Sequence, residues 1–286
     1  MKTLKPIRAL IFTVLILFGS NALATPKESL DKLFQDSKRL FYKDDFDGSL
    51  NVLKKYFNQL LTITKAKART KLRFSAIAAM GRIYLQEKQD PKGAIQWFEK
   101  IQKTQTLTEA EQDIIRGWIA GAQDWIKAGK FPKEVKSEQD LFELGTKYYQ
   151  SGLKKQKFPM DQAGAADFSI ASSYFMPFLV RFDKSPNVGE VLFMMGDMRR
   201  RFWTDTEYWS KNYYLTEAIR RFAGTPLAMK SYAVLEEDVH FGYSGSGGDS
   251  TPDSWKVMLG ELKKISEMKL DPSMSPEIPA KKTVQP

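Results

Sequence analysis

Apolar side chains recur at helical spacing along most of this chain. In most stretches between residues 27 and 268 a large apolar residue returns every three or four positions, which is the period of an amphipathic helix. The alternation of apolar and polar residues typical of a strand, with β-branched side chains, is missing. Turn and capping residues divide the stretch into about eleven helices. The sequence therefore predicts an all-α fold without strands.

Helix boundaries are predicted from capping residues, prolines and glycines. Asp90-Pro91 starts one helix, and Thr108 and Thr204 each open a capping box with a glutamate three residues later. Pro177 is expected to kink or end its helix. The helices are expected at 27–42, 49–61, 65–88, 91–103, 108–128, from 137 onward, 161–178, from 185 onward, 204–222, 226–240 and 252–268. Residues 242–250, rich in Gly and Ser, are expected to form a flexible loop.

The first 24 residues predict a cleavable signal peptide. Lys2, Lys5 and Arg8 precede an apolar run at 9–18, and Ala22-Leu23-Ala24 fits the small-x-small cleavage pattern. A transmembrane anchor is the alternative, but the run is short for a bilayer. The chain contains no cysteine, so a lipid-anchored lipoprotein is excluded. We expect a periplasmic or secreted protein that begins at Thr25.

The mature chain is expected to contain two helical-repeat blocks, residues 25–131 and 132–269, followed by a disordered proline-rich tail at 270–286. The loop at 130–133 marks the boundary between the blocks. Without cysteine no disulfide can form, so stability must come from helix packing. No other stretch is long and apolar enough for a membrane helix, so no transmembrane segment is expected in the mature chain.

The net charge narrows the classes of partner. The formal charge of the whole chain is +10, and removal of the three basic residues in the signal peptide leaves +7. An exported protein does not ordinarily meet nucleic acid. Its anionic neighbours would be cell-wall carboxylates, lipid phosphates or acidic proteins. The alternative is that the charge only keeps the protein soluble.

Small and large residues are arranged for helix pairing at three places. Gly81 and Ala94 are small where two antiparallel helices would touch, and Tyr84 and Phe98 are large where they would fill the space between helices. The same features return in part downstream. The residues of this repeat-packing set are Gly81, Tyr84, Ala94, Phe98, Gly145, Tyr148 and Gly196. The helix pair cannot bury both its faces alone, so neighbours must stack on it.

The pattern at residues 80–101 resembles a tetratricopeptide (TPR) repeat. The intervals between the glycines, 64 and then 51 residues, depart from the regular period of about 34 in that family. The resemblance implies an irregular TPR-like solenoid of antiparallel helix pairs. It also implies a groove that binds protein or peptide, with no catalysis and no cofactor. Exported helical-repeat adaptors of the Gram-negative envelope are of this kind.

The best candidate for a binding site is the stretch from Arg199 to Tyr214, because arginine and aromatic residues are enriched at binding hot spots. Such side chains would suit an acidic peptide or a sugar polymer. The alternative is that the tryptophans pack between helices while the arginines are solvated. The candidate binding residues are Arg199, Arg200, Arg201, Trp203, Tyr208 and Trp209. A second basic run at 65–73 is interpreted as a solvated face.

No catalytic or metal-binding pattern is found. His240 is the only histidine, and the partner residues that a Ser-His-Asp triad or a histidine zinc site would need are missing. His240 is interpreted as part of a solvated helix end. Met194, Met195 and Met198 could bind Cu(I) but are expected to pack in the core. Asp44, Asp45 and Asp47 could supply the paired carboxylates of glycoside hydrolysis, but they lie in a turn, where aspartate is expected for capping.

The sequence therefore predicts an exported scaffold, not an enzyme, with no cofactor and no metal. It would bind another envelope protein or peptide through a helical-repeat groove. A cell-wall glycan binder, or an accessory to a cell-wall lytic enzyme, is the alternative. Contact of the basic faces with an anionic cell-wall or lipid surface is a third hypothesis.

Overall fold

The computed structural model describes residues 29–62, 66–158, 161–201 and 208–269, with the side chains of residues 66–69 and 208–211 left out. The signal peptide, the C-terminal tail and the Thr204 capping box that the sequence predicts therefore lie outside the described residues. Within them, no helix is long and apolar enough to cross a membrane.

The described residues form an all-α fold of eleven helices, as the sequence predicts. A π-helical turn, η1 (Ile83–Glu87), follows α4, and a short 3-10 helix, η2 (Gln162–Gly164), precedes α8. The helices are α2 (Leu30–Phe41), α3 (Phe46–Leu61), α4 (Ala66–Arg82), α5 (Pro91–Thr104), α6 (Glu109–Ala128), α7 (Glu138–Lys155), α8 (Ala165–Arg181), α9 (Val188–Arg201), α10 (Tyr208–Arg221), α11 (Pro226–Tyr243) and α12 (Asp253–Ser266).

The expectation of no strand is wrong at one place. Residues 242–250 were expected to be a flexible loop, but β1 (Ser244–Gly245) and β2 (Gly248–Asp249) pair in an antiparallel hairpin between α11 and α12. Each strand is two residues long and exposed. Two residues are too few to show the alternation of apolar and polar side chains by which a strand is recognised in a sequence.

Local side-chain hydrogen bonds set the helix starts that the sequence predicts. The Asp90 carboxylate accepts from the backbone N–H of Gly93 at the start of α5. Thr108 and Glu111 form the capping box of α6, and Gly129 ends that helix in the left-handed conformation, at φ 68°. These interactions lie within four residues along the chain, which is why the sequence reveals them.

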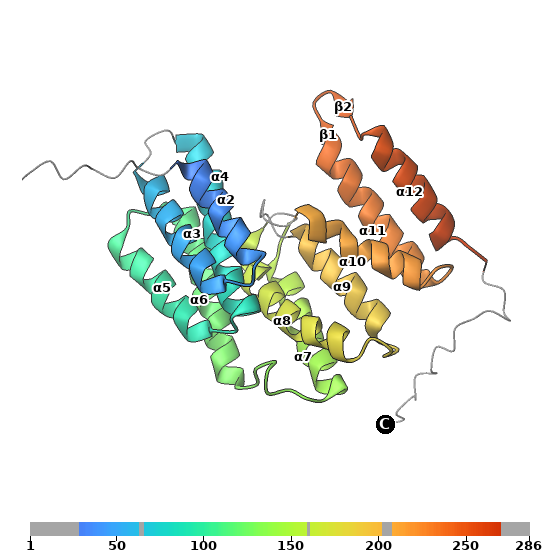
Figure 1. Cartoon of the computed structure of the whole chain (residues 1–286), viewed down its shortest axis with the longest axis horizontal. Helices are drawn as coiled ribbons and strands as arrows, with labels where there is room; N and C mark the ends of the chain where they lie inside the picture. The colour runs from blue at the N-terminus through green and yellow to red at the C-terminus, as the bar shows by residue number, and fades with distance from the viewer. Residues whose placement is uncertain (1–28, 63–65, 159–160, 202–207, 270–286) are drawn as a thin grey trace, which may run out of the picture.

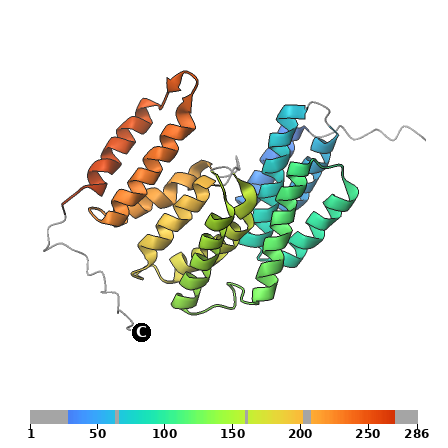
Figure 2. The same ribbon diagram turned by 180° about the vertical axis from the view of Figure 1, so that it is seen from behind.

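Successive helices pack side by side in chain order. The closest partners are α2 with α3, α5 with α6, α7 with α8, and α9 with α10, while α11 packs on α10 and α12 on α11. In Figures 1 and 2 the helices follow one another from one end of an elongated molecule to the other. One cluster of buried apolar residues extends from Leu33 to Leu262. The division into two blocks at residue 131 stays a prediction.

Helix α8 occupies the middle of the molecule (Figure 1). It contacts α4, η1, α6, α7 and α9, and residues 165–175 are all buried. The expectation that Pro177 kinks or ends this helix is wrong in one respect, because α8 continues to Arg181. Proline removes one backbone hydrogen bond. Burial of the preceding three turns among five neighbouring elements outweighs that loss.

The packing glycine Gly81 faces a different helix from the one expected. A Cβ atom at Gly81 would lie 2.4 Å from the Trp118 ring of α6, whereas the TPR-like pattern places Gly81 against Ala94 of α5. Ala94, Tyr84 and Phe98 are buried, and the Phe98 ring stacks on Trp118 with centroids 6.3 Å apart. The space that glycine leaves is therefore filled by a tryptophan that is distant in sequence.

The other two packing glycines also allow close approach between helices. A Cβ at Gly145 on α7 would meet the Phe175 ring of α8 at 2.4 Å, and one at Gly196 on α9 would meet Leu215 of α10 at 2.5 Å. Tyr148 is buried as well. In both cases the contact is with the next helix along the chain, within a closely packed helix pair.

The basic run at 65–73 is not a simple solvated face. Arg73 is buried, and its Nε lies 2.8 Å from Oε1 of the buried Glu111. One Nη donates to the carbonyl of Thr106 at 3.2 Å. Arg73 therefore joins α4 to the start of α6. Lys71 of the same run is exposed, as expected, and the side chains of Lys65, Lys67 and Arg69 lie outside the described residues.

Candidate functional site

The three consecutive arginines predicted as a binding site have internal roles. Arg199 is 4% exposed and its guanidinium lies 6.0 Å from the centroid of the Tyr214 ring. Arg82, on α4, is also buried. Burial lowers the pKa of both guanidinium groups, and the charge of Arg199 lowers the pKa of Arg82 further. Arg199 is therefore not the solvated charge that the alternative interpretation expected, because its side chain is buried and lies against Tyr214 of α10.

Arg200 and Arg201 hold a buried carboxylate. Asp197, one turn earlier on α9, is 3% exposed. Its two oxygens accept from Nε of Arg200 and Nε of Arg201, each at 2.8 Å, and from the Tyr149 hydroxyl of α7 at 2.8 Å. Burial raises the pKa of the Asp197 carboxyl, but hydrogen bonds from Arg201 and Arg200 outweigh burial and hold it below the usual value. These two arginines are therefore part of the link between α7 and α9.

The two arginines also reach beyond Asp197. Arg200 donates to Glu237 of α11 at 3.1 Å, and Arg201 donates to the Gln156 side chain at 2.7 Å. Both guanidinium-bearing side chains are about one-fifth exposed, at 22% and 23%. The remaining candidates cannot be placed with them, because Trp203 and the side chains of Tyr208 and Trp209 lie outside the described residues. A binding role for the six residues stays a prediction.

The polar cluster around Arg82 was missed in the sequence. Arg82 Nε donates to the Gln86 side chain at 3.1 Å, and Gln86 donates to Glu87 at 2.8 Å. Glu87 also lies 3.6 Å from the Arg82 guanidinium. Gln86 and Glu87 belong to the π-helical turn η1, and such turns often occur at functional sites. The sequence feature that could have indicated this cluster is a pair of polar residues four positions apart, Arg82 and Gln86, within an apolar stretch.

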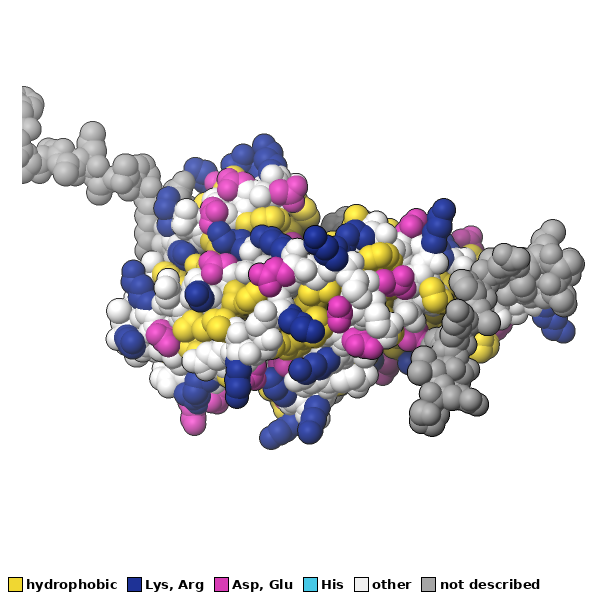
Figure 3. Space-filling model, turned by 90° about the horizontal axis from the view of Figure 1, so that it is seen from below, with side chains coloured by type: hydrophobic (Ala, Val, Ile, Leu, Met, Phe, Trp, Pro, Cys, Tyr) yellow, Lys and Arg dark blue, Asp and Glu magenta, His cyan; other side chains and the backbone are white. Residues whose placement is uncertain are grey.

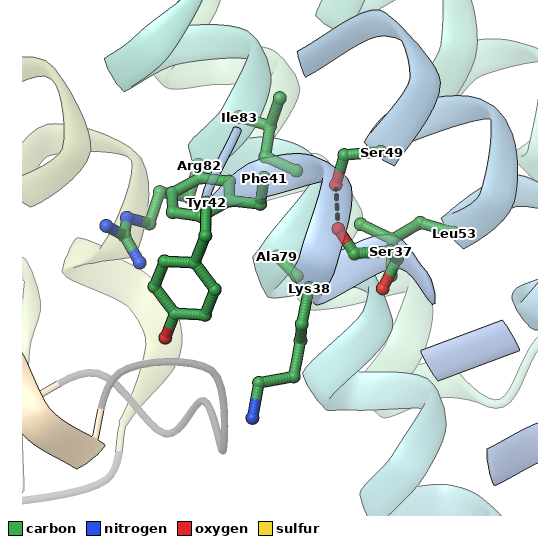
Figure 4. Close-up of a pocket in the computed structure, with 9 residues that line it drawn as sticks. All are labelled: Ser37, Lys38, Phe41, Tyr42, Ser49, Leu53, Ala79, Arg82 and Ile83. Atoms are coloured by element: carbon green, nitrogen blue, oxygen red, sulfur yellow. Dashed lines mark hydrogen bonds between the residues drawn. The ribbon is translucent and has the colours of Figure 1, made fainter. Parts of the chain in front are cut away.

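An apolar pocket lies beside Arg82, between α2, α3 and α4 (Figure 4). It encloses about 340 Å³ of space, its open mouth included. The backbone carbonyl of Ser37 accepts from the Ser49 hydroxyl at 2.9 Å on one side. Lys38 and the mostly exposed Tyr42 extend from the other side, as Figure 4 shows. Most of the lining is buried, so the pocket is a narrow crevice beneath α2 and not an open surface for a large ligand.

A larger groove lies where α7, α9 and α11 come together, and we call it the α7–α9–α11 groove. It encloses about 1020 Å³, its open mouth included. Buried Tyr149, Phe193 and Met194 form its floor, while Gln150, Glu190 and Lys230 are exposed at its edge. The groove is lined by Thr146, Tyr149, Gln150, Leu153, Glu190, Phe193, Met194, Pro226, Leu227 and Lys230.

The floor of this groove is fixed by contacts with its surroundings. The Tyr149 hydroxyl donates to buried Asp197 at 2.8 Å, and Nζ of Lys230 lies 4.0 Å from the centroid of the Phe193 ring. Met194, Met195 and Met198 are buried, as expected for core methionines. The groove could not be recognised in the sequence, because its lining residues on the three helices are separated by more than thirty positions along the chain.

The surface carries mixed charge. On the face seen in Figure 3, Lys and Arg side chains are dispersed among Asp and Glu, and apolar side chains are exposed between them. This face therefore offers no continuous basic stripe. Within the described residues, no group of three or more His, Asp or Glu side chains is arranged to hold a metal ion.

Comparison of the chain with protein-family models, with curated proteins and with solved structures finds no match. The likeness to a TPR repeat therefore rests on the residue pattern of the sequence alone.

Proposed function

We propose that this chain is an exported adaptor without catalytic activity, which binds a segment of another envelope protein in the α7–α9–α11 groove. The observation that carries the proposal is the groove itself, which is open and has an apolar floor formed by α7 and α9, with α11 at its edge. Tyr, Phe and Met are residue types enriched at protein interfaces. Export is supported by the N-terminal sequence pattern, and envelope partners follow from export.

The groove is prepared for binding before a partner arrives. Tyr149 is held by Asp197, and Phe193 is covered by Lys230. Side chains that are already ordered lose little conformational entropy on association, so more of the contact energy contributes to affinity. The ion pairs of Asp197 with Arg200 and Arg201 therefore fix the carboxylate that holds Tyr149 in the groove floor.

The dimensions of the groove limit what it can hold. Thr146 and Leu153, the outermost lining residues on α7, are separated by a rise of about 10 Å along the helix. An extended chain covers that distance in about three residues. The groove therefore suits two or three apolar side chains of a partner segment, with the rest of the interface on neighbouring helix surfaces.

The edge of the groove favours acidic residues beside that apolar segment. Gln150 is exposed at the edge, and Lys147 and Lys154 are exposed three positions before and four positions after it, on the same side of α7. Lys230 is exposed on α11, while Glu190 is the acidic residue in the lining. A net positive edge would speed the approach of an acidic partner.

Site-specific photo-crosslinking in intact cells tests the proposal. A benzoylphenylalanine residue in place of Gln150 should give a discrete crosslinked product with one envelope protein. The matched control is the same change at Gln123, an exposed glutamine on α6. Addition of Lys230→Glu to the Gln150 variant should lower the yield, because it reverses a charge at the groove edge. The same product from both glutamine positions would contradict a role for the groove.

A sedimentation assay separates this function from glycan binding. The purified mature protein is mixed with purified sacculi at low and at high salt, and the pelleted fraction is measured. An adaptor for proteins should stay in the supernatant. Strong co-sedimentation that Lys230→Glu leaves unchanged would favour the glycan-binding alternative and a different surface.

A further inference from the structure

The only histidine of the chain joins a helix end to the hairpin that follows it. His240 lies in the last turn of α11. Its Nδ1 is 2.7 Å from Oδ2 of Asp249 on β2 and 3.2 Å from the hydroxyl oxygen of Thr251. Thr251 is buried, whereas His240 and Asp249 are each about two-fifths exposed. The sequence-based interpretation of His240 as a solvated helix end overlooked this contact.

The hydrogen bonds around Asp249 define the tautomer of His240. Oδ1 of Asp249 accepts from the backbone N–H of Thr251 at 2.9 Å and from its hydroxyl at 2.5 Å. The hydroxyl hydrogen of Thr251 is thus directed at Asp249, and a carboxylate can only accept. The hydrogen between His240 and Asp249 must therefore be on Nδ1. Nε2 is the nitrogen that gains a proton in acid.

The hairpin has few other attachments to the helix before it. The backbone N–H and the hydroxyl of Ser250 both donate to the carbonyl of Tyr243, at 3.1 and 2.8 Å. The residues from 244 to 249 are exposed, and three of the six are glycine. Segments with few buried contacts open at low free-energy cost. The His240 contact is therefore a substantial part of what orders the hairpin.

We propose that His240, Asp249 and Thr251 form a pH-sensitive clasp, which holds the 244–249 hairpin against the end of α11 and tightens when His240 takes up a proton. An imidazole changes its charge between about pH 5 and 8. The protonated ring donates a charge-assisted hydrogen bond to the carboxylate, which is about twice as strong as a neutral one. The clasp should weaken as pH rises, since the ring becomes neutral, although the Nδ1–H bond persists.

Other charged groups nearby have partners of their own. On α11, Glu236 accepts from the Tyr232 hydroxyl at 2.6 Å. Glu237 accepts from Arg200 of α9. On α12, Asp253 lies 3.0 Å from Lys256. Asp249 is the carboxylate in direct contact with the imidazole.

Asp249 stays charged over the relevant range. Its pKa is held below the usual value, chiefly by the two hydrogen bonds from Thr251 and also by the contact with His240. Toward low pH, the clasp is therefore lost only when Asp249 becomes protonated, below the usual aspartate range. Between that limit and deprotonation of His240, both partners are charged and the clasp is strongest.

Release of the hairpin should not release α12. Leu259 and Leu262 of α12 are buried in the core, and the carbonyl of Ile265 accepts from the backbone N–H of Gly224 at 3.2 Å. These contacts do not involve His240. The change with pH should therefore be confined to the hairpin, which makes α12 an internal control.

Two measurements on the mature protein test the clasp. Because there is one histidine, its imidazole ¹⁵N signals can be observed without ambiguity, and the neutral ring should show the Nδ1–H tautomer. Hydrogen-exchange protection of residues 244–249, corrected for intrinsic rates, should fall by about two- to fivefold from about pH 5.5 to about pH 8, the range expected for an exposed ion pair. Protection of α12 should stay constant.

The variant His240→Asn is the matched control, because its amide can donate from the position of Nδ1 but does not titrate. Its hairpin protection should not change with pH. An Nε2–H tautomer in the neutral ring would overturn the proposal. So would an equal change of hairpin protection in the variant, or a parallel loss of protection in α12.

Discussion

The carboxylate of Asp197 should contribute more to stability than an ordinary aspartate, and Asp197→Asn is the perturbation that tests this. The side chain is 3% exposed and receives hydrogen bonds from Arg200, Arg201 and Tyr149. Asparagine has the same shape but no charge. Its NH₂ group would have to face a guanidinium N–H, so at least one buried donor would lose its acceptor.

The magnitude follows from the burial of the two sides of the ion pair. Removal of one partner from a fully buried pair costs about 3 to 5 kcal/mol. Here Asp197 is buried but Arg200 and Arg201 are about one-fifth exposed, so water can compensate part of the loss. We expect the free energy of unfolding to fall by about 2 to 3 kcal/mol.

Urea unfolding followed by circular dichroism at neutral pH measures this change. The matched control is Asp113→Asn, which removes an exposed ion pair with Arg116 in the next turn of α6. Exposed pairs of this kind contribute about 0 to 1 kcal/mol. Equal losses for the two variants would show that Asp197 is solvated in solution, and the reasoning from burial would be refuted.

The pH dependence has a defined sign. The pKa of Asp197 in the folded protein lies below the usual value for an aspartate. A lowered pKa contributes stability that is fully present above the unfolded-state value and is lost as pH falls through the folded-state value. The difference between wild type and Asp197→Asn should therefore be constant from neutral pH to about pH 5 and shrink below about pH 4. A difference that grows in this acid range would contradict the assignment.

Two further predictions concern packing and a second buried ion pair. Gly81→Ala should lower the melting temperature, because its Cβ would lie 2.4 Å from Trp118, whereas Gly117→Ala should raise it slightly, because a Cβ there meets nothing within 4 Å and alanine favours a helix by about 1 kcal/mol. The same sign in both variants would contradict the close contact. Glu111→Gln should lower the free energy of unfolding by about 3 kcal/mol, since it leaves buried Arg73 without its carboxylate, and urea titration would measure this. A loss within the range of exposed pairs would contradict that estimate.

The sequence determined the helices because the interactions that define them are local. Thr108 and Glu111 meet across three residues, and Asp90 caps the turn that it begins. Their identities are therefore enough to place a helix start. The apolar period likewise records which side of each helix is buried. It does not record which neighbour covers that side, and Gly81 was accordingly assigned to the wrong helix.

Only the tertiary structure decided the end of α8, the hairpin and the candidate site. Pro177 stays within a helix because distant elements cover the turns before it. Arg199 to Arg201 have the residue types of a binding surface, but their partners include Tyr149 and Glu237, which are separated from them by tens of residues. The α7–α9–α11 groove likewise exists only where three helices meet. Local hydrogen bonds and periodicity are encoded in neighbouring residues, whereas burial and charge pairing depend on which distant segments the fold brings together.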